Sequence, residues 1–342
     1  MLITGIRPSV PLPIGGMSRR ILLMAMTWLA VLPASPAASA ADPIADFPNK
    51  PLRVIHGFAA GGDVFARILA TKLSDTWKQH LVVDNRPGAG GTIGAQIVAK
   101  ANADGYTLLS VTPAHAVAPA MYSKLPYDVI KDFAGIAAIA SQPAALVVNN
   151  ALGVKSVSEL IALARSKPGQ LNFASAGVGS ATHFSAELFK NLARIDVVHV
   201  PYKGIPEALT DTMTGRVQYF ISPLNLVLPF IKEGKVLALG VSTPKQRVSM
   251  LPDVPTIAES GLPGYEWSLW YGFLAPAKTS RPLIVKLNRE ITRILALPEM
   301  RQRWSALGAE SAPMTAEQFD RFIAEQVEIF TKLARSAGIK TN

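Results

Sequence analysis

Two short segments of this chain place glycines at the ends of apolar runs. Residues 58–62 read Phe-Ala-Ala-Gly-Gly, and residues 175–183 contain Gly177, Gly179, Ser180 and Thr182. Glycine lets the backbone come close to a bound group, and a helix that begins in such a loop points its free N–H groups at that group. These residue types in this arrangement indicate a binding site for an anion such as a carboxylate.

Motifs for the common hydrolytic chemistries are missing from the sequence. The only comparable serine segment, residues 177–181, reads GVGSA and not G-x-S-x-G, and no H-E-x-x-H occurs. There is no cysteine, and the histidines lack metal-ligand spacing; they are His56, His80, His115, His183 and His199. We therefore expect a protein that is not an enzyme and has no cofactor or metal, with an exported hydrolase as the less favoured alternative.

A third glycine-rich segment, VVDNRPGAGG at residues 82–91, follows an apolar β-like run and leads into a helix. It misses the dinucleotide fingerprint, because the glycine after Gly88 and Gly90 falls one residue late, at Gly94. If the preceding strand lies at the edge of its sheet, this loop is scaffold. We interpret it as structural.

The elements that would position these loops alternate between strands and helices. Strands are expected at residues 52–56, 81–83, 106–110, 171–174, 196–200, 217–221 and 236–241, with helices starting at about Asp63 and spanning 181–193, 206–214, 224–232 and 282–297. Capping boxes begin two more helices, at Ser156 and Thr315. The apolar run 135–149 is interrupted at Ser141-Gln142-Pro143, a plausible crossing to a second lobe. An aromatic group, Trp267, Trp270 and Tyr271, could line a pocket for a flat acid, although packing between lobes is the favoured interpretation.

This alternation predicts an α/β protein with two lobes. Residues 45–142 and 245–342 would form lobe 1, and residues 143–244 lobe 2. Ligands of open α/β sheets bind at the carboxyl ends of the strands. The predicted ligand-binding residues are therefore those of the strand exits: Phe58, Ala59, Ala60, Gly61, Gly62, Thr112, Ala114, His115, Ser175, Gly177, Gly179, Ser180, Thr182, His183, Tyr202, Lys203 and Ser222.

The first 40 residues are typical of a cleaved export signal. Arg7, Arg19 and Arg20 precede the apolar run 21–32, and Ala38-Ser39-Ala40 is a small-x-small cleavage site. The run is shorter than the roughly 20 residues that a membrane-spanning helix needs. We expect a periplasmic protein cleaved near Ala40, exported by either the general or the twin-arginine route.

The composition restricts the partners. The formal charge of +10 becomes +7 when the three arginines of the leader are removed, and the remaining basic residues are scattered. No block of like charge indicates nucleic acid, and no second apolar stretch indicates insertion in a membrane. We expect a monomer after removal of the signal.

Several motifs together resemble the receptors of tripartite tricarboxylate transporters, the TctC or Bug-type solute-binding proteins. Besides residues 82–91 they are DGYTLL (104–109), LPYD (125–128), HVPYKG (199–204), LPDVPT (251–256) and LPGY (262–265). The resemblance implies a type II-like periplasmic-binding-protein fold, a Venus flytrap that closes on a small carboxylate and delivers it to integral-membrane permease subunits. It also implies that residues 58–62 and 175–182 hold the carboxylate.

The chain departs from the family pattern at one point. Gly61-Gly62 runs directly into Asp63, where the family has two intervening residues. This shortening should reshape the ligand loop. A role as an exported ligand sensor for a signalling kinase also stays open, because a receptor of either kind signals by closing its lobes.

Overall fold

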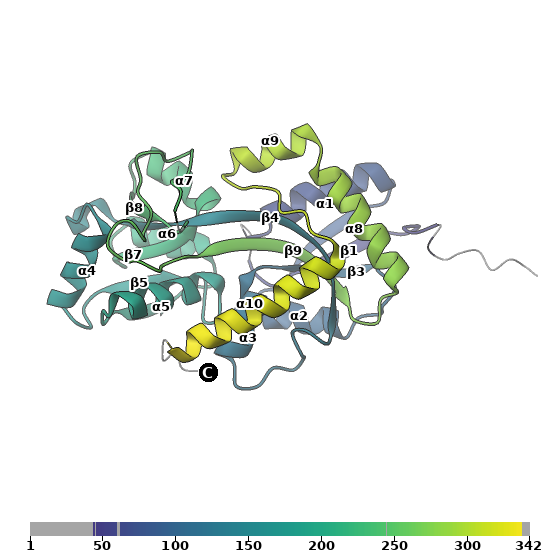
Figure 1. Ribbon diagram of the computed structural model, residues 1–342, viewed down its shortest axis with the longest axis horizontal. Helices are drawn as coiled ribbons and strands as arrows, with labels where there is room; N and C mark the ends of the chain where they lie inside the picture. The colour runs from purple at the N-terminus through teal and green to yellow at the C-terminus, as the bar shows by residue number, and fades with distance from the viewer. Residues whose placement is uncertain (1–43, 45, 60–61, 244, 337–342) are drawn as a thin grey trace, which may run out of the picture. The chain divides into compact units, whose positions relative to one another are not determined.

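The computed structural model describes residues 44, 46–59, 62–243 and 245–336 (Figure 1). The predicted export signal and residues Ala60 and Gly61 lie outside the described residues. Strands and helices alternate through most of the chain, as predicted. The strands are β1 (Leu52–His56), β2 (Leu81–Asn85), β3 (Thr107–Val111), β4 (Phe133–Val148), β5 (Asn172–Ser175), β6 (Val198–Pro201), β7 (Tyr219–Pro223), β8 (Leu237–Val241) and β9 (Ser268–Pro276).

Helices connect these strands and close the chain. The α-helices are α1 (Val64–Trp77), α2 (Thr92–Ala99), α3 (Pro113–Met121), α4 (Val157–Ser166), α5 (Ala181–Ala193), α6 (Ile205–Met213), α7 (Leu224–Lys232), α8 (Arg281–Leu295), α9 (Pro298–Ala306) and α10 (Ala316–Ser336), with short 3-10 turns η1 (Ala89–Gly91) and η2 (Asn150–Leu152). Both predicted N-caps form: Ser156 Oγ accepts from the N–H of Glu159, and Thr315 Oγ1 accepts from that of Gln318. The reciprocal bond of a capping box forms at Thr315, whose N–H donates to Gln318 Oε1, whereas the Glu159 side chain accepts from the N–H of Lys155. Helix α3 differs from the prediction, which treated this stretch as a strand exit only.

The strands form two groups. In the first, the order is β2-β1-β3-β9-β4, with β1 parallel to both β2 and β3 and with β9 antiparallel to β3 and β4. In the second, the order is β4-β7-β5-β6, with β8 also paired to β4. Parallel β5 lies between β6 and β7. Strand β2 is at the edge of the sheet, which is the position that the scaffold interpretation of residues 82–91 required.

Strands β4 and β9 join the two groups (Figure 1). Strand β4 is one continuous strand of 16 residues: it pairs with β9 from Phe133 to Pro143 and with β7 from Ala144 onward. The predicted crossing at residues 141–143 therefore coincides with this change of partner.

The lobe boundaries themselves stay a prediction. The contacts of residues 245–266 concern the second boundary, where the chain would return from lobe 2 to lobe 1. Thr256 forms a bridge with Val241 at the end of β8, and Tyr265 Oη donates to the carbonyl of Ser185 in α5. These contacts favour a second crossing nearer to β9 than to residue 245.

Long amphipathic helices cover the first group of strands. Helix α8 packs on β4 and α1, and α10 packs on α3 and β4. The Nε1–H of the fully buried Trp304 in α9 donates to the carbonyl of Ile139, at 2.7 Å. No helix among residues 46–336, as far as they are described, has the length and apolar character needed to cross a membrane.

Candidate ligand-binding site

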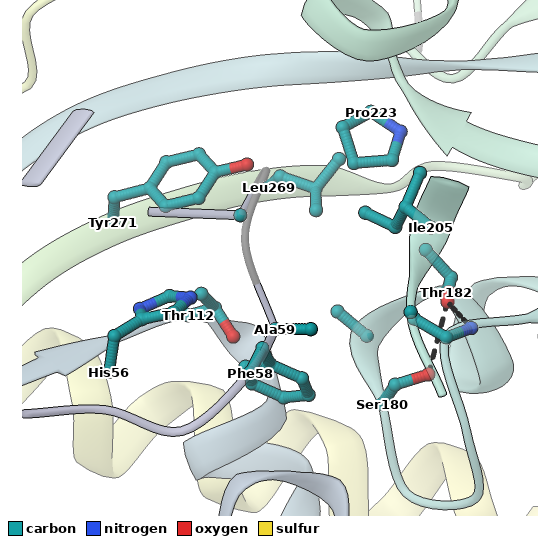
Figure 2. A pocket seen from close by; sticks show the side chains of 14 residues that line it. His56, Phe58, Ala59, Thr112, Ser180, Thr182, Ile205, Pro223, Leu269 and Tyr271 are labelled. Atoms are coloured by element: carbon teal, nitrogen blue, oxygen red, sulfur yellow. Dashed lines mark hydrogen bonds between the residues drawn. The ribbon is translucent and has the colours of Figure 1, made fainter. Parts of the chain in front are cut away.

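The beginnings of five described helices converge on one cavity (Figure 2). Gly62 precedes Asp63, the N-cap of α1; Thr112, Ser180, Gly204 and Pro223 are the N-caps of α3, α5, α6 and α7. The cavity has room of about 50 Å³ for water-sized molecules. It is lined by His56, Phe58, Ala59, Gly62, Thr112, Ala176, Ser180, Ala181, Thr182, Gly204, Ile205, Pro223, Leu269 and Tyr271.

The helix beginnings differ in how their first backbone N–H groups are used. Thr112 accepts a hydrogen bond from the N–H of Ala114, and Ser180 accepts one from that of His183. The N-caps of α1, α6 and α7 make no such side-chain bond. The first-turn N–H groups of a helix have no partner within the helix, and they carry its partial positive charge. The cavity is therefore a favourable place for an anion.

None of the described residues lining the cavity is Asp, Glu, Lys or Arg. The described wall therefore offers an anion backbone N–H groups and hydroxyl groups, and not a cationic side chain. Most of the wall is apolar, through residues such as Phe58, Ile205 and Leu269, while Thr112, Ser180 and Tyr271 supply hydroxyl groups. Such a lining suits a small acid with a carboxylate at one end and an apolar body.

The glycine loop before α5 uses most of its own polar groups. The N–H of Ala176 donates to Thr182 Oγ1 at 2.9 Å, that of Gly179 donates to His183 Nδ1 at 3.2 Å, and that of Ser180 donates to the carbonyl of Gly177. The loop thus shapes the beginning of α5. The donors it offers to the cavity are the N–H groups of Ala181 and Thr182, because that of His183 is taken by Ser180 Oγ.

The structure brings only part of the predicted site together. The residues that line the cavity are Phe58, Ala59, Gly62, Thr112, Ser180 and Thr182. The predicted residues that do not line it are Ala114, His115, Ser175, Gly177, Gly179, His183, Tyr202, Lys203 and Ser222. Ala60 and Gly61 are outside the described residues. A ligand role for those outside the cavity stays a prediction.

The two predicted histidines have partners elsewhere. His115 is buried with its Nε2 2.9 Å from the carbonyl oxygen of Val129, and burial lowers its pKa to about 4. His183 stacks on His199, with ring centroids 3.9 Å apart, and burial followed by the charge of His199 lowers the pKa of His183 to about 3. His183 is therefore neutral at pH 7, and its 3.8 Å contact with Glu187 is not an ion pair.

The other residues outside the cavity are also engaged or exposed. Ser175 Oγ lies 2.6 Å from His199 Nε2, but Ser175 is fully buried and does not line the cavity, so this pair is not positioned to attack a ligand there. Tyr202 donates to Asp211, and Lys203 is exposed. Ser222 is buried beside Pro223.

Eight lining residues were not among the predicted ligand-binding residues, although Tyr271 was considered as a pocket-lining residue and several of the others lie within the predicted ligand loops: His56, Ala176, Ala181, Gly204, Ile205, Pro223, Leu269 and Tyr271. Of the aromatic group, Tyr271 faces the cavity, whereas Trp267 packs on Phe184 and Trp270 packs on Phe319. A signal existed for His56, which is a polar residue at the end of β1, directly before the predicted ligand loop.

A polar network borders the cavity where the two groups of strands meet. The Nε2–H₂ group of Gln142, on β4, donates to Tyr271 Oη at 2.6 Å and to Asn225 Oδ1 at 2.9 Å. Tyr271 lies on β9 and Asn225 on α7, so this network ties both sides of the crossing together. Because Tyr271 Oη accepts from Gln142, its own proton is available to a ligand.

Asp63 begins α1 without capping it. Asp63 occupies the N-cap position, and its Oδ2 lies 2.6 Å from Nε of Arg67, one turn along. This pairing directs the Asp63 carboxylate toward a cation on its own helix. Gly62, immediately before Asp63, remains on the cavity wall. The effect of the shortened loop stays a prediction, because Ala60 and Gly61 lie outside the described residues.

The segment 82–91 touches both ligand loops. A Cβ on Gly57 would lie 2.7 Å from Gly91, and a Cβ on Gly90 would lie 2.9 Å from the carbonyl oxygen of Val178. Tyr122 Oη, at the end of α3, donates to the same carbonyl at 3.0 Å. This segment therefore supports the cavity from outside while contacting the glycine loop of the second strand group.

Comparison with known proteins agrees with this architecture. The sequence model of the tripartite tricarboxylate transporter family receptor matches residues 65–339. BugT of Bordetella pertussis is 36% identical over 298 residues, covering 86% of this chain and 91% of BugT. A protein encoded in the tcbD-tcbE intergenic region of Pseudomonas sp. (strain P51) is 36% identical over 299 residues, covering 86% of this chain and 89% of that protein.

Solved structures of similar proteins carry carboxylates. R. palustris Rpa4515 with adipate has a TM-score of 0.83 at 34% identity, and MatC of Rhodopseudomonas palustris with bound malate has 0.80 at 32%. The matches cover 86% and 84% of this chain and 100% of each relative. The two-lobed α/β architecture is thus that of periplasmic binding proteins. The chain belongs to the tripartite tricarboxylate transporter receptor family, the TctC or Bug-type solute-binding proteins.

Proposed function

We propose that this protein is a periplasmic receptor that captures a small organic carboxylate between its two lobes and delivers it to the permease subunits of a tripartite transporter. The observation that carries the proposal is the convergence of five helix beginnings on a cavity without a charged side chain. Backbone N–H groups at helix N-termini stabilise an anion in a fixed geometry.

The relatives support the ligand class. Adipate and malate are the molecules named with two structures of similar sequence and fold. The apolar lining and small volume of this cavity favour a short-chain acid. The proposed lobes are residues 45–142 with 245–342, and 143–244, with closure by rotation about β4 and β9.

A thermal-shift screen of the mature protein against mono-, di- and tricarboxylates, followed by isothermal titration of the hits, tests the ligand class. Ligand at about 1,000 times its dissociation constant should stabilise the native state by roughly 4 kcal/mol, which raises Tm by several degrees. Failure of every acid to bind folded, ligand-free protein would contradict the proposal.

Cell fractionation and N-terminal sequencing test export and cleavage near Ala40. Pull-down of membrane proteins with the closed, ligand-bound receptor distinguishes a permease partner from a sensor kinase. Recovery of a kinase alone would replace the transport role with signalling.

A further inference from the structure

His56 is the lining residue whose chemistry the helix beginnings do not explain. It ends β1, its side chain is fully buried, and its Nδ1 lies 3.2 Å from Ser110 Oγ. Its Nε2 has no hydrogen-bond partner among the described residues, and His56 lines the ligand cavity. Buried polar atoms in native proteins are nearly always paired, because leaving one unpaired costs about 1–3 kcal/mol.

Gly62 lies directly against Nε2. A Cβ on Gly62 would lie 3.2 Å from Nε2, so glycine is the residue that keeps a side chain away from this atom. Nε2 itself has almost no accessible surface, so a ligand reaches it only with some movement of the cavity wall. Figure 2 shows His56 on the side of the cavity opposite Ser180, Thr182 and Ile205. A ligand that reaches both sides therefore meets the beginnings of α5 and α6 at one end, and His56 together with Gly62 and Thr112 at the other.

His56 takes part in this contact as a neutral ring. Burial is the main cause that lowers its pKa to about 4; the nearby Asp63 raises the pKa and Arg67 lowers it. A neutral imidazole has one N–H donor and one bare nitrogen acceptor. If the Ser110 hydroxyl donates to Nδ1, the ring proton is on Nε2 and faces the cavity.

We propose that Nε2–H of His56 donates a hydrogen bond to a second oxygen function of the bound acid, in the tautomer selected by Ser110. This inference rests on the proposed function and narrows its ligand class. The receptor should prefer acids that carry another oxygen, such as a second carboxylate, a hydroxyl or an oxo group, over simple fatty acids of equal length.

The ligand arm of the test compares matched probes on the wild-type protein: adipate with hexanoate, and succinate with butyrate. Adipate or succinate should bind at least 10-fold more tightly than the member of its pair that lacks the second carboxylate, about 1.4 kcal/mol. Equal binding of both members of both pairs would overturn the inference and leave the proposed function intact. Failure of all four acids, and of every acid in the wider screen, would overturn both.

The protein arm uses isothermal titration of variants with the tightest of these probes. His56→Leu keeps the bulk but removes the donor, and should weaken binding roughly 10-fold or more. His56→Gln keeps an N–H donor near the position of Nε2 and should recover most of the affinity. His80→Gln is the control for the substitution itself, because His80 is an exposed histidine that does not line this cavity and was not predicted to bind the ligand. Unchanged affinity in His56→Leu would overturn the inference.

NMR of the wild-type protein tests the same inference if a variant does not fold. The ring ¹⁵N signals of wild-type protein labelled in histidine report which nitrogen carries the proton. On addition of the probe, the His56 signals should show a protonated Nε2 that shifts and a bare Nδ1. A proton on Nδ1 in the complex, or an Nε2 signal that does not respond, would overturn the inference.

Discussion

Tyr122 provides the sharpest test of how the two lobes hold each other. Its hydroxyl donates to the carbonyl of Val178 in the glycine loop, and its ring lies against Gly90 and Gly179, where an added Cβ would come within 2.8 and 2.6 Å of Oη. Tyr122 follows α3, on the side of the first strand group, whereas Val178 precedes α5. If this bond exists only when the lobes are closed, Tyr122→Phe should destabilise the closed state and leave the open state unchanged.

The magnitude follows from one neutral hydrogen bond, about 0.5–1.5 kcal/mol. Apparent affinity scales with the population of the binding-competent state, so the dissociation constant should rise about 2- to 10-fold. Isothermal titration with the tightest acid measures this rise, and chemical unfolding of the ligand-free protein should give an almost unchanged stability.

Tyr106→Phe is the matched control. Tyr106 Oη bonds to the N–H and to Oδ1 of Asn49 within the first strand group, so its loss should lower stability and leave affinity unchanged. If Tyr122→Phe instead lowered the stability of the ligand-free protein without changing affinity, the bond would persist in the open state and the reasoning would be refuted.

Three further outcomes are expected. Ala181→Asp places a carboxylate in the first turn of α5, on the cavity wall, and should abolish acid binding. The Tm of this variant should be unchanged or higher, because acidic groups stabilise helix N-termini by about 0.3–1 kcal/mol. Normal binding by this variant would contradict the assigned site. Gly177→Val should lower the unfolding free energy by roughly 1–2 kcal/mol. Gly177 has φ +113°, and a Cβ added at this position would lie 3.2 Å from the carbonyl oxygen of Tyr202. An unchanged unfolding free energy in urea would count against this backbone conformation. Acidification from pH 6.5 to 4 should destabilise the ligand-free fold, because the unfolded chain takes up protons near pH 6.5 while four histidines, three buried and one half-buried, resist protonation until their lowered pKa values of about 3 to 4. They are His56, His115, His183 and the half-buried His199. Urea unfolding across this range measures the loss of stability, and a flat profile would show that these rings are not held neutral.

The order of strands and helices could be predicted from local patterns, because each element has its own periodicity and capping residues. Helices α5 and α7 begin and end at the predicted residues. Helix α3 was not predicted, because Pro113 and Pro119 within an alanine-rich stretch are typical of a loop; Pro113 occupies the first turn, where it costs no hydrogen bond.

Only the parts of the site that follow from the order of elements along the sequence could be predicted. The rule that ligands bind at strand exits selected Gly62, Thr112 and Ser180, which do line the cavity. Tyr271 and Leu269 reach it because β9 inserts between β3 and β4, a pairing between distant segments that no local pattern encodes. The stacking of His183 on His199 likewise joins a helix to a separate strand and takes His183 away from the cavity.

In the proposed site, the backbone at the helix beginnings binds the carboxylate, whereas the side chains of the wall determine which acid fits. Affinity for the carboxylate and selectivity among acids therefore depend on different groups. Main-chain N–H groups neither gain nor lose protons, so affinity near neutral pH should follow the ionisation of the ligand and not that of the protein. Substitutions at Phe58, Ile205 or Leu269 reshape the space around the ligand without removing any of these donors. In the proposed site, changes of the wall residues could therefore alter which acid is bound, while the backbone donors to the carboxylate stay the same.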